Sequence, residues 1–220
     1  MRVKVTVVDY GVGNLLSVCR AVEHCGADVA LAESAAQILA AERLILPGVG
    51  AFADAMKALD QRDMVGAIQS YAQTGRLFLG ICLGMQMMLS ESDEFGKYAG
   101  LNLIPGKVVR ISSTDVNGHQ HKVPHIGWNQ LVYPAKKDGT HWLGSILDGL
   151  SAGASAYFVH SFTALPDNPE ARLADAVYGG SLLSAVIRMN NLYGCQFHPE
   201  KSGPIGLKII ENFIHRCICF

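Results

Sequence analysis

Residues 76–89 read RLFLGICLGMQMML and decide the fold. The apolar run 76–81 predicts a strand buried on both faces, and residues 83–89 predict a helix that begins immediately after it. A strand that passes through a glycine-flanked turn directly into a helix is the repeating unit of a parallel sheet. This stretch therefore predicts an α/β fold.

The same strand–helix order is repeated on the N-terminal side of this stretch. We expect strands at residues 3–8, 27–31 and 43–46, and helices at residues 15–25, 34–41 and 53–72. Asn14 stands at the N-cap position of the first helix, Gly26 ends that helix, and the third helix is broken near Asp63. Four such repeats predict parallel strands with helices on both faces.

The C-terminal half has a different pattern. Strand-like runs follow one another with few helices between them, at residues 108–111, 127–132, 155–159, 173–178, 184–188 and 193–197, before a closing helix at 204–217. We expect an open, mostly parallel central sheet with helices on both faces and extra antiparallel strands in the second half. No linker or internal repeat interrupts the pattern, so residues 1–220 are predicted to form a single domain.

Composition excludes several classes of partner. The 220 residues are 50% hydrophobic and 17% charged, and 18 basic against 19 acidic residues leave a net charge of −1. Such a balance gives no electrostatic reason to bind nucleic acid or an anionic membrane. Asp9 ends the first apolar run, and no apolar stretch reaches the roughly 20 residues that span a bilayer. We expect a cytoplasmic protein.

The cysteines do not predict a disulfide framework or a metal site. The chain has six cysteines, none of them in a CxxC pair. Cys217 and Cys219 stand in the last four residues, where we expect a frayed end.

Cys82 stands in the spacing G-x-C-x-G, between Gly80 and Gly84. This is the thiol analogue of the nucleophile elbow, a tight strand-to-helix turn that exposes one side chain at the edge of the sheet. A cysteine at a helix N-terminus also feels the positive end of the helix dipole, which favours the thiolate. The alternative interpretation is a small buried residue at a strand–helix junction.

A second motif, Phe-His-Pro-Glu at residues 197–200, follows the last predicted strand. Pro199 disfavours the helical region for His198, and residues i and i+2 of an extended chain point the same way. Glu200 is therefore expected to reach the ring of His198 and orient it, as the third group of a nucleophile–base–orienter set. The alternative is a solvated turn before the closing helix.

A third motif, Pro-Gly-Val-Gly at residues 47–50, follows another predicted strand. Paired glycines let the backbone approach a ligand closely and let a peptide turn its N–H inward. Together with the N–H of Leu83, this segment predicts an oxyanion hole. The alternative is an ordinary glycine-rich loop.

Two further patterns do not predict a bound group. Gly-Val-Gly at residues 11–13 resembles the start of a dinucleotide fingerprint, but Leu16 stands where the third glycine belongs. His119, His121 and His125 lie close together without the cysteine or carboxylate ligands that would complete a tetrahedral site, so we expect a polar loop there.

Residues 80–86 (GICLGMQ) and 198–202 (HPEKS) together resemble the class I, triad-type glutamine amidotransferases. Four more blocks are similar to one branch of that family, the glutaminase subunits of imidazole glycerol phosphate synthase: DYGVGN at 9–14, LPGVGAF at 46–52, PHIGWN at 124–129 and YFVHSF at 157–162. The resemblance covers about residues 3–215.

The resemblance implies roles for individual residues. Cys82 would be the nucleophile on the amide of L-glutamine, His198 the acid–base and Glu200 its orienter. Val49 and Leu83 would supply the oxyanion hole. The positions that hold glutamine in the family are matched by Gly48, Gly50, Gln86, Ser161 and Phe162. No cofactor or metal is implied.

The resemblance also implies a partner, the cyclase subunit, a (β/α)₈ barrel that would receive the ammonia and use it in histidine biosynthesis. Positions at or near that interface are matched by Asn14, Trp128, Tyr157 and Lys201. Two alternatives stay open: a related subunit that supplies ammonia to a sugar amidotransferase of surface polysaccharides, and a catalytically idle binding subunit.

Phe162 departs from the family pattern, because relatives usually carry tyrosine at this position. If glutamine is held there through the backbone, loss of the hydroxyl has little effect; if it is held through the phenol, affinity falls.

Overall fold

The strand β4 (Phe78–Cys82) lies at the centre of a nine-stranded sheet in the computed structural model, which describes residues 2–215. Parallel strands lie on both sides of β4. They are β3 (Arg43–Gly48), β1 (Lys4–Val8) and β2 (Asp28–Ala32) on one side, and β13 (Leu192–Cys195) on the other. The carboxyl ends of these five strands therefore meet at one edge of the sheet.

Beyond β13 the sheet continues with antiparallel strands. In spatial order they are β12 (Ser181–Met189), β11 (Arg172–Tyr178), β8 (His125–Val132) and β9 (Ser155–His160). The expectation of an open α/β sheet with parallel strands and additional antiparallel strands from the second half is confirmed.

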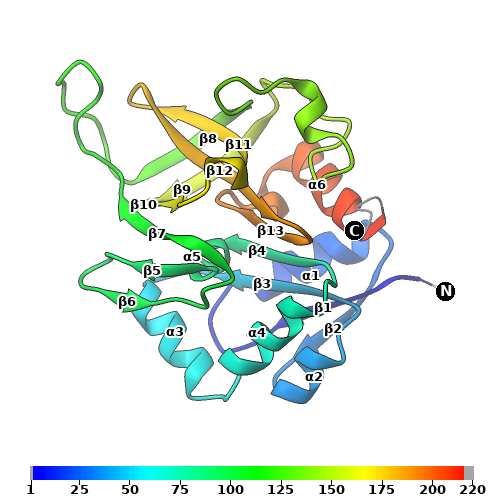
Figure 1. Cartoon of the computed structure of the whole chain (residues 1–220). Helices are drawn as coiled ribbons and strands as arrows, with labels where there is room; N and C mark the ends of the chain where they lie inside the picture. Colours follow the sequence, from blue (N-terminus) through cyan, green and yellow to red (C-terminus); the bar gives the residue numbers. More distant parts are fainter. Residues whose placement is uncertain (1, 216–220) are drawn as a thin grey trace.

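Helices cover both faces of the parallel part of the sheet (Figure 1). On one face α1 (Leu15–His24) packs beside α6 (Gly203–His215). The opposite face carries α2 (Ala35–Leu39), α3 (Phe52–Asp60) and α4 (Val65–Gln73). Each face has its own apolar core, so the inner strands β1, β3 and β4 are buried on both sides, as their apolar sequences require.

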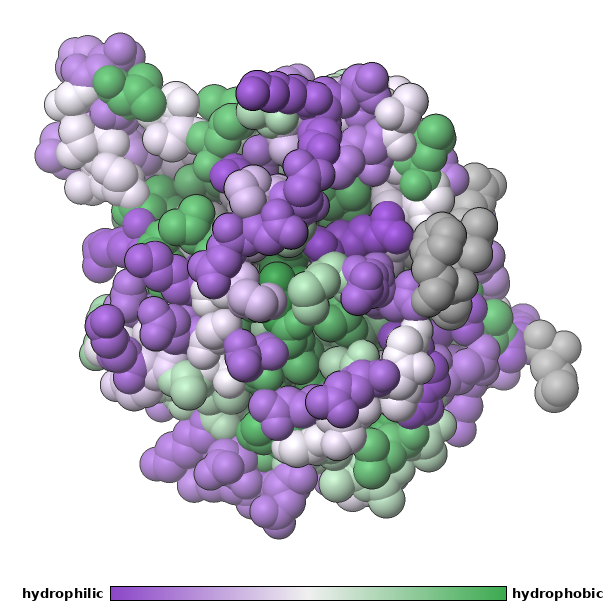
Figure 2. Space-filling model, in the orientation of Figure 1, coloured by the Kyte–Doolittle hydropathy of each residue, from purple (hydrophilic) through white to green (hydrophobic). Residues whose placement is uncertain are grey.

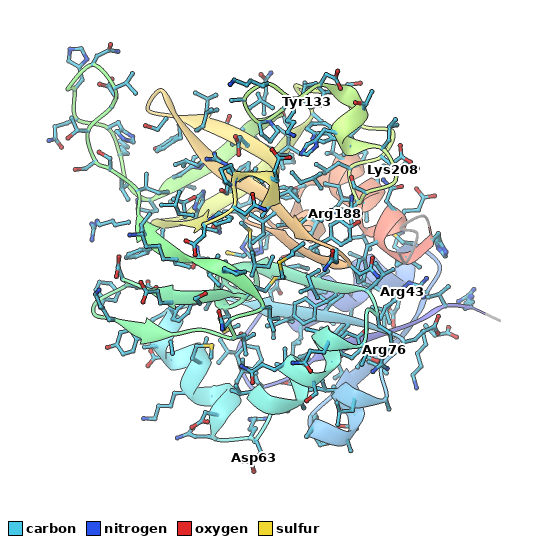
Figure 3. The ribbon with its side chains drawn as sticks, in the orientation of Figure 1. Arg43, Asp63, Arg76, Tyr133, Arg188 and Lys208 are labelled. Carbon is cyan, nitrogen blue, oxygen red and sulfur yellow. The ribbon has the colours of Figure 1, made fainter. Side chains whose placement is uncertain are left out.

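The third predicted helix divides into α3 and α4 where the break was expected. Asp63 adopts a left-handed backbone, φ 55°, and Figure 3 shows its side chain directed away from the protein between the two helices. Asn14 stands at the N-cap of α1, but its side chain makes no capping hydrogen bond. Cys217 and Cys219 lie outside the described residues. None of the helices within residues 2–215 is long and apolar enough to cross a membrane.

A second, four-stranded sheet was not fully expected. Its order is β10 (Phe162–Pro166), β7 (Ile104–Arg110), β5 (Leu89–Ser92) and β6 (Tyr98–Ala99). The helix predicted at 83–89 is wrong at its end: α5 (Leu83–Met87) stops early, and Leu89 begins β5. Pairing of β5 with β7 and β6 overrides the local preference, a tertiary effect that periodicity does not contain.

The prediction of one polar loop for three histidines is wrong for His125. His119 and His121 belong to the segment after β7 that projects from the body at the upper left of Figure 1. His125 instead begins β8 and is buried between the rings of Phe158 and Tyr178.

Gly84 is required by the close approach of α5 to β3. A Cβ on Gly84 would overlap the carbonyl oxygen of Leu46, which belongs to backbone that cannot move aside. We expect Gly84→Ala to lower the free energy of unfolding by more than about 3 kcal/mol, or to prevent folding. The exposed Gly66 in α4 has open space at its Cβ, so Gly66→Ala should instead stabilise the protein by about 0.5 kcal/mol. Urea denaturation of both variants tests this, and equal effects would contradict it.

Candidate functional site

Cys82 is the last residue of β4 and precedes the first residue of α5. Its backbone has φ 54° and ψ −112°, a conformation that costs a non-glycine residue about 1–3 kcal/mol. The turn is possible because its flanks are glycines: a Cβ on Gly80 would lie 2.8 Å from the backbone of Gly84. The strain and the spacing are those of a nucleophile elbow, as the G-x-C-x-G pattern indicated.

His198 follows β13, the strand next to β4, and comes to the same edge of the sheet as Cys82. Its backbone is extended, φ −98° and ψ 97°, as expected before Pro199. The extended run does not continue to Glu200, because residues Pro199–Lys201 form a 3₁₀ turn, η3. This turn still brings Glu200 Oε1 to 2.8 Å from His198 Nδ1, with both side chains at least 96% buried.

The surroundings of His198 favour its protonated form. Burial works to lower the pKa of the imidazole. The hydrogen bonds and charges of Cys82 and Glu200 outweigh burial and raise this pKa to about 9. A protonated imidazole beside the sulfur places a proton donor next to the cavity.

Most of the residues expected at the site line one cavity of about 420 Å³. Cys82 and His198 line it, together with the other predicted residues Val49, Gly50, Leu83, Gln86, Ser161, Phe162 and Lys201. Three elements remote in sequence therefore converge here: the 47–50 loop, the β4–α5 turn and the β9–β10 connection.

Gln86 joins two walls of this cavity. Its Nε2 donates to the carbonyl of Phe162 at 3.0 Å and to Oε1 of Gln196 at 3.0 Å. Gln196 Nε2 lies in turn 3.9 Å from the Cys82 sulfur. Phe162 takes part through its backbone, while its ring packs edge-on against Phe95, so this contact does not need the tyrosine hydroxyl of relatives.

The segment 47–50 lies beside the nucleophile turn. Gly48 pairs with Cys82 in the β3–β4 register and is buried, and a Cβ on Gly48 would lie 2.9 Å from the Gly84 nitrogen and from the Tyr10 hydroxyl oxygen. Tyr10 donates to the carbonyl of Pro47 at 2.9 Å and so holds the start of the segment. Val49 is 38% exposed at the rim.

Of the four residues expected at a partner interface, Asn14 and Lys201 line gaps beside His198, whereas Trp128 and Tyr157 lie on the paired strands β8 and β9. Asn14 lines a narrow gap together with Gly48, His198 and Glu200. Lys201 is exposed and lines the main cavity. Trp128, 59% exposed on β8, contacts the ring of Tyr157 on β9 edge-on at 6.1 Å between centroids, and the Tyr157 carbonyl accepts from the His198 N–H at 3.1 Å.

Sequence reasoning missed three residues of the site: Gln196, Glu94 and His160. Gln196 had a signal, because it stands two residues before His198, near the end of the strand predicted at 193–197, and alternate residues of an extended chain point the same way. Glu94 lines the cavity and accepts from the N–H of Phe52 at 2.7 Å, which fixes the start of α3; its loop has no local pattern that predicts this. His160 reaches its position because β9 pairs with β8, a contact between strands that the local sequence does not predict.

The opposite end of the sheet carries no comparable chemistry. A cavity of about 570 Å³ lies there, lined by residues such as Gly75, Asn102 and Leu192 and by no titratable side chain. Figure 3 shows Arg43, Arg76 and Arg188 toward this end. Figure 2 shows an apolar area near the centre of a mainly hydrophilic face. Within residues 2–215 no group of three histidine, cysteine or acidic side chains is arranged to hold a metal.

An open parallel sheet with a strained cysteine at one strand end and a buried His–Glu pair at the neighbouring strand end is the arrangement of the class I glutamine amidotransferases. Residues 6–217 match the family model described as glutamine amidotransferase class-I. The structure of PurLQS from Thermotoga maritima has a similar fold, with a TM-score of 0.71 at 18% identity over 97% of this chain and 98% of that one.

Two relatives identify the branch of this family. The chain is 54% identical over 210 residues to imidazole glycerol phosphate synthase subunit HisH 1 of Legionella pneumophila strain Paris, covering 96% of this chain and 98% of the relative. It is 44% identical to subunit HisH of Methanosarcina barkeri strain Fusaro, covering 97% and 99%. The chain therefore belongs to the HisH family of class I glutamine amidotransferases.

The raised pKa of His198 depends in part on Glu200, so Glu200→Gln should lower it from about 9 toward 6.5. Because the folded-state pKa is raised, this interaction stabilises the fold fully below pH 6.5 and is lost as the pH rises through about 9. NMR titration of the His198 ring measures the change. Glu170→Gln, which removes a carboxylate on the surface, is the control and should leave the value near 9. An unchanged pKa in Glu200→Gln would contradict the assignment.

Proposed function

We propose that this protein hydrolyses L-glutamine to glutamate and ammonia and delivers the ammonia to the cyclase subunit of imidazole glycerol phosphate synthase in histidine biosynthesis. The observation that carries this proposal is the strained Cys82 in a 420 Å³ cavity, next to a His198 ring held by Glu200 at 2.8 Å. Relatives named HisH at 42–54% identity support the pathway.

In the first half of the reaction, the Cys82 thiolate attacks the side-chain amide carbon of glutamine. The N–H groups of Leu83 and Val49 stabilise the oxyanion that forms on the amide oxygen. His198, protonated at the pH of the cell, gives its proton to the amide nitrogen, and ammonia leaves as the tetrahedral intermediate collapses to a thioester. Glu200 keeps the imidazolium oriented toward the sulfur.

In the second half, the neutral His198 takes a proton from a water molecule that attacks the thioester. Glutamate leaves, and the proton returns Cys82 and His198 to their starting state. Gln86, Ser161, Phe162, Gly48 and Gly50 hold the glutamine during both steps, and Phe162 acts through its backbone. Glu94, which also lines the cavity and accepts from the Phe52 N–H close to the 47–50 segment, offers a carboxylate that suits the α-amino group of an amino-acid substrate.

The partner in this proposal is a (β/α)₈ barrel that docks over the mouth of the site. Asn14, Trp128, Tyr157 and Lys201 would contact it. The support is an apolar rim: Leu16 near Asn14 is 62% exposed, and Ile126 on the same face of β8 as Trp128 is 59% exposed. Exposed apolar side chains of this size around a catalytic mouth are typical of a protein–protein interface.

We also propose that residues 1–220 form one glutamine amidotransferase domain, supported by the family match over residues 6–217. A cytoplasmic location belongs to the same proposal. Its support is that Cys19, Cys25, Cys82 and Cys195 of the described chain are all free thiols, as in a reducing compartment.

Cys82→Ala is expected to abolish glutamine-dependent synthesis of imidazole glycerol phosphate by the complex and to leave ammonia-dependent synthesis intact, because the acceptor chemistry belongs to the partner. Glutamate release and product formation are measured with each nitrogen source. Cys19→Ala, a half-buried thiol in α1, is the control and should keep both activities. Glutamine-dependent turnover retained in Cys82→Ala would refute the proposal.

Glutamate release by the wild-type protein, with and without the cyclase, distinguishes the proposed function from its two alternatives. Glutamate release that rises on addition of the cyclase and its ribotide ligand supports the proposal. A rate of glutamine hydrolysis that does not change when the cyclase is added would assign the ammonia to another acceptor, such as a sugar amidotransferase. Tight association without any glutamate release would make the chain a binding subunit.

Trp128→Ala is expected to raise the Kd for the cyclase at least tenfold, about 1.4 kcal/mol, because an indole that is 59% exposed in the free chain would bury a large contact area on docking. Isothermal calorimetry measures the Kd. Leu39→Ala in α2 removes an apolar side chain of 44% exposure on another surface and should leave the Kd unchanged. Equal Kd values for wild type and Trp128→Ala would place the interface elsewhere.

A further inference from the structure

Two buried histidines behind the glutamine cavity have no place in the proposed mechanism. His125, on β8, is 3% exposed and does not line the cavity, whereas His160, on β9, is 7% exposed and does. His125 Nδ1 lies 3.0 Å from His160 Nε2, and His160 Nδ1 lies 2.8 Å from the carbonyl oxygen of Phe162. The same carbonyl accepts from Gln86. A chain of hydrogen bonds therefore runs from β8 to the glutamine site.

The direction of this chain is determined at its cavity end. The Phe162 carbonyl oxygen can only accept, so the hydrogen that joins it to His160 stands on Nδ1. In a neutral imidazole the other nitrogen is then an acceptor. His160 Nε2 consequently accepts, and His125 Nδ1 must donate to it.

The Asn129 end of this hydrogen-bond chain independently requires the same direction of donation. Asn129 Nδ2 donates to the carbonyl of Val177 at 2.8 Å, and Asn129 Oδ1 accepts from the N–H of Gln130 at 2.8 Å. These backbone groups have one role each, so they orient the amide. The Nδ2 group therefore faces His125 Nε2, at 3.2 Å, as a donor, which leaves the His125 proton on Nδ1.

The surroundings keep both rings neutral. Burial lowers the pKa of His125 to about 4. Burial, with the nearby charges of His125 and His198, lowers the pKa of His160 to about 4 against the opposing effect of the Phe162 carbonyl. His125 is also stacked between Phe158 and Tyr178, at ring-centroid distances of 4.9 and 4.0 Å, so it has little freedom to turn.

We propose that His125 is a positioning residue of the glutamine site: its Nδ1–H holds His160 in the Nδ1–H tautomer, and His160 in turn holds the Phe162 carbonyl in place for Gln86. In the other tautomer, the Nδ1 lone pair of His160 would face the lone pairs of that carbonyl, and the wall formed by Ser161 and Phe162 would shift. The kinetic consequence of this inference rests on the proposed glutaminase function. The tautomers of the two histidines do not depend on that function.

The kinetic test compares variants in the complex with the cyclase. His125→Phe keeps a ring between Phe158 and Tyr178 but removes the donor. We expect the KM for glutamine to rise about tenfold while kcat stays within about twofold, because Cys82, His198 and Glu200 are untouched. His125→Asn, whose amide nitrogen occupies the place of Nδ1, should restore KM to within about twofold of the wild type.

His121→Phe is the matched control, since His121 also packs on Tyr178, at 4.9 Å, but has no bond to His160. It should leave KM unchanged. A wild-type KM in His125→Phe overturns the proposal. So does an equal loss of kcat and melting temperature in His125→Phe and His125→Asn, which would indicate a merely structural role.

The tautomers are measured on the isolated chain by ¹⁵N-edited NMR of the histidine rings, without any activity. Protonated Nδ1 and unprotonated Nε2 on both His125 and His160 at neutral pH support the proposal, as does a switch of His160 to Nε2–H in His125→Phe. A proton on Nε2 of either ring in the wild type overturns it. If the wild-type complex releases no glutamate, the proposed function fails while this measurement still decides the positioning role.

Discussion

The close contact between α5 and the end of β3 is the constraint on which the site depends. Gly84 touches the backbone of Leu46, and Gly80 touches that of Gly84, so the chain can leave β4 and enter α5 only through one tight turn. Cys82 occupies that turn with a positive φ, and its side chain lines the cavity at the edge of the sheet. The strain is sustained because the flanking apolar segments are completely buried and cannot relax.

Parallel pairing then supplies the second half of the catalytic set. Because β13 lies beside β4 in the same direction, the residues that follow it arrive beside Cys82, which lines the cavity. His198 and Glu200 are buried there as a charged pair next to the sulfur, and this arrangement holds the ring protonated well above its ordinary pKa. The helices on the two faces do no chemistry; they keep the strands buried and therefore in register.

The antiparallel half of the sheet builds one wall of the cavity. The β9–β10 connection presents Ser161 and the Phe162 carbonyl to the cavity, and β8 supports it from behind through His125 and His160. Polar groups buried this deeply are costly unless every donor meets an acceptor. In the His125–His160 network, backbone groups at both ends of the hydrogen-bond chain allow only one arrangement of protons. This network therefore gives the cavity wall at Ser161 and Phe162 a single geometry.

The sequence alone determined the α/β class, the strand order along the chain and the three motifs that carry Cys82, His198–Glu200 and residues 47–50, because glycine spacing, proline and uninterrupted apolar runs act locally on the backbone. It could not determine the second sheet, where pairing of β5 overrides the helical pattern at 88–89, or the burial of His125. Glu94 enters the site only because its loop contacts the start of α3, a segment distant in sequence. Tertiary structure alone decided these contacts and the proton positions in the histidine pair, since a hydrogen-bond partner contributed by another strand leaves no trace in local sequence pattern.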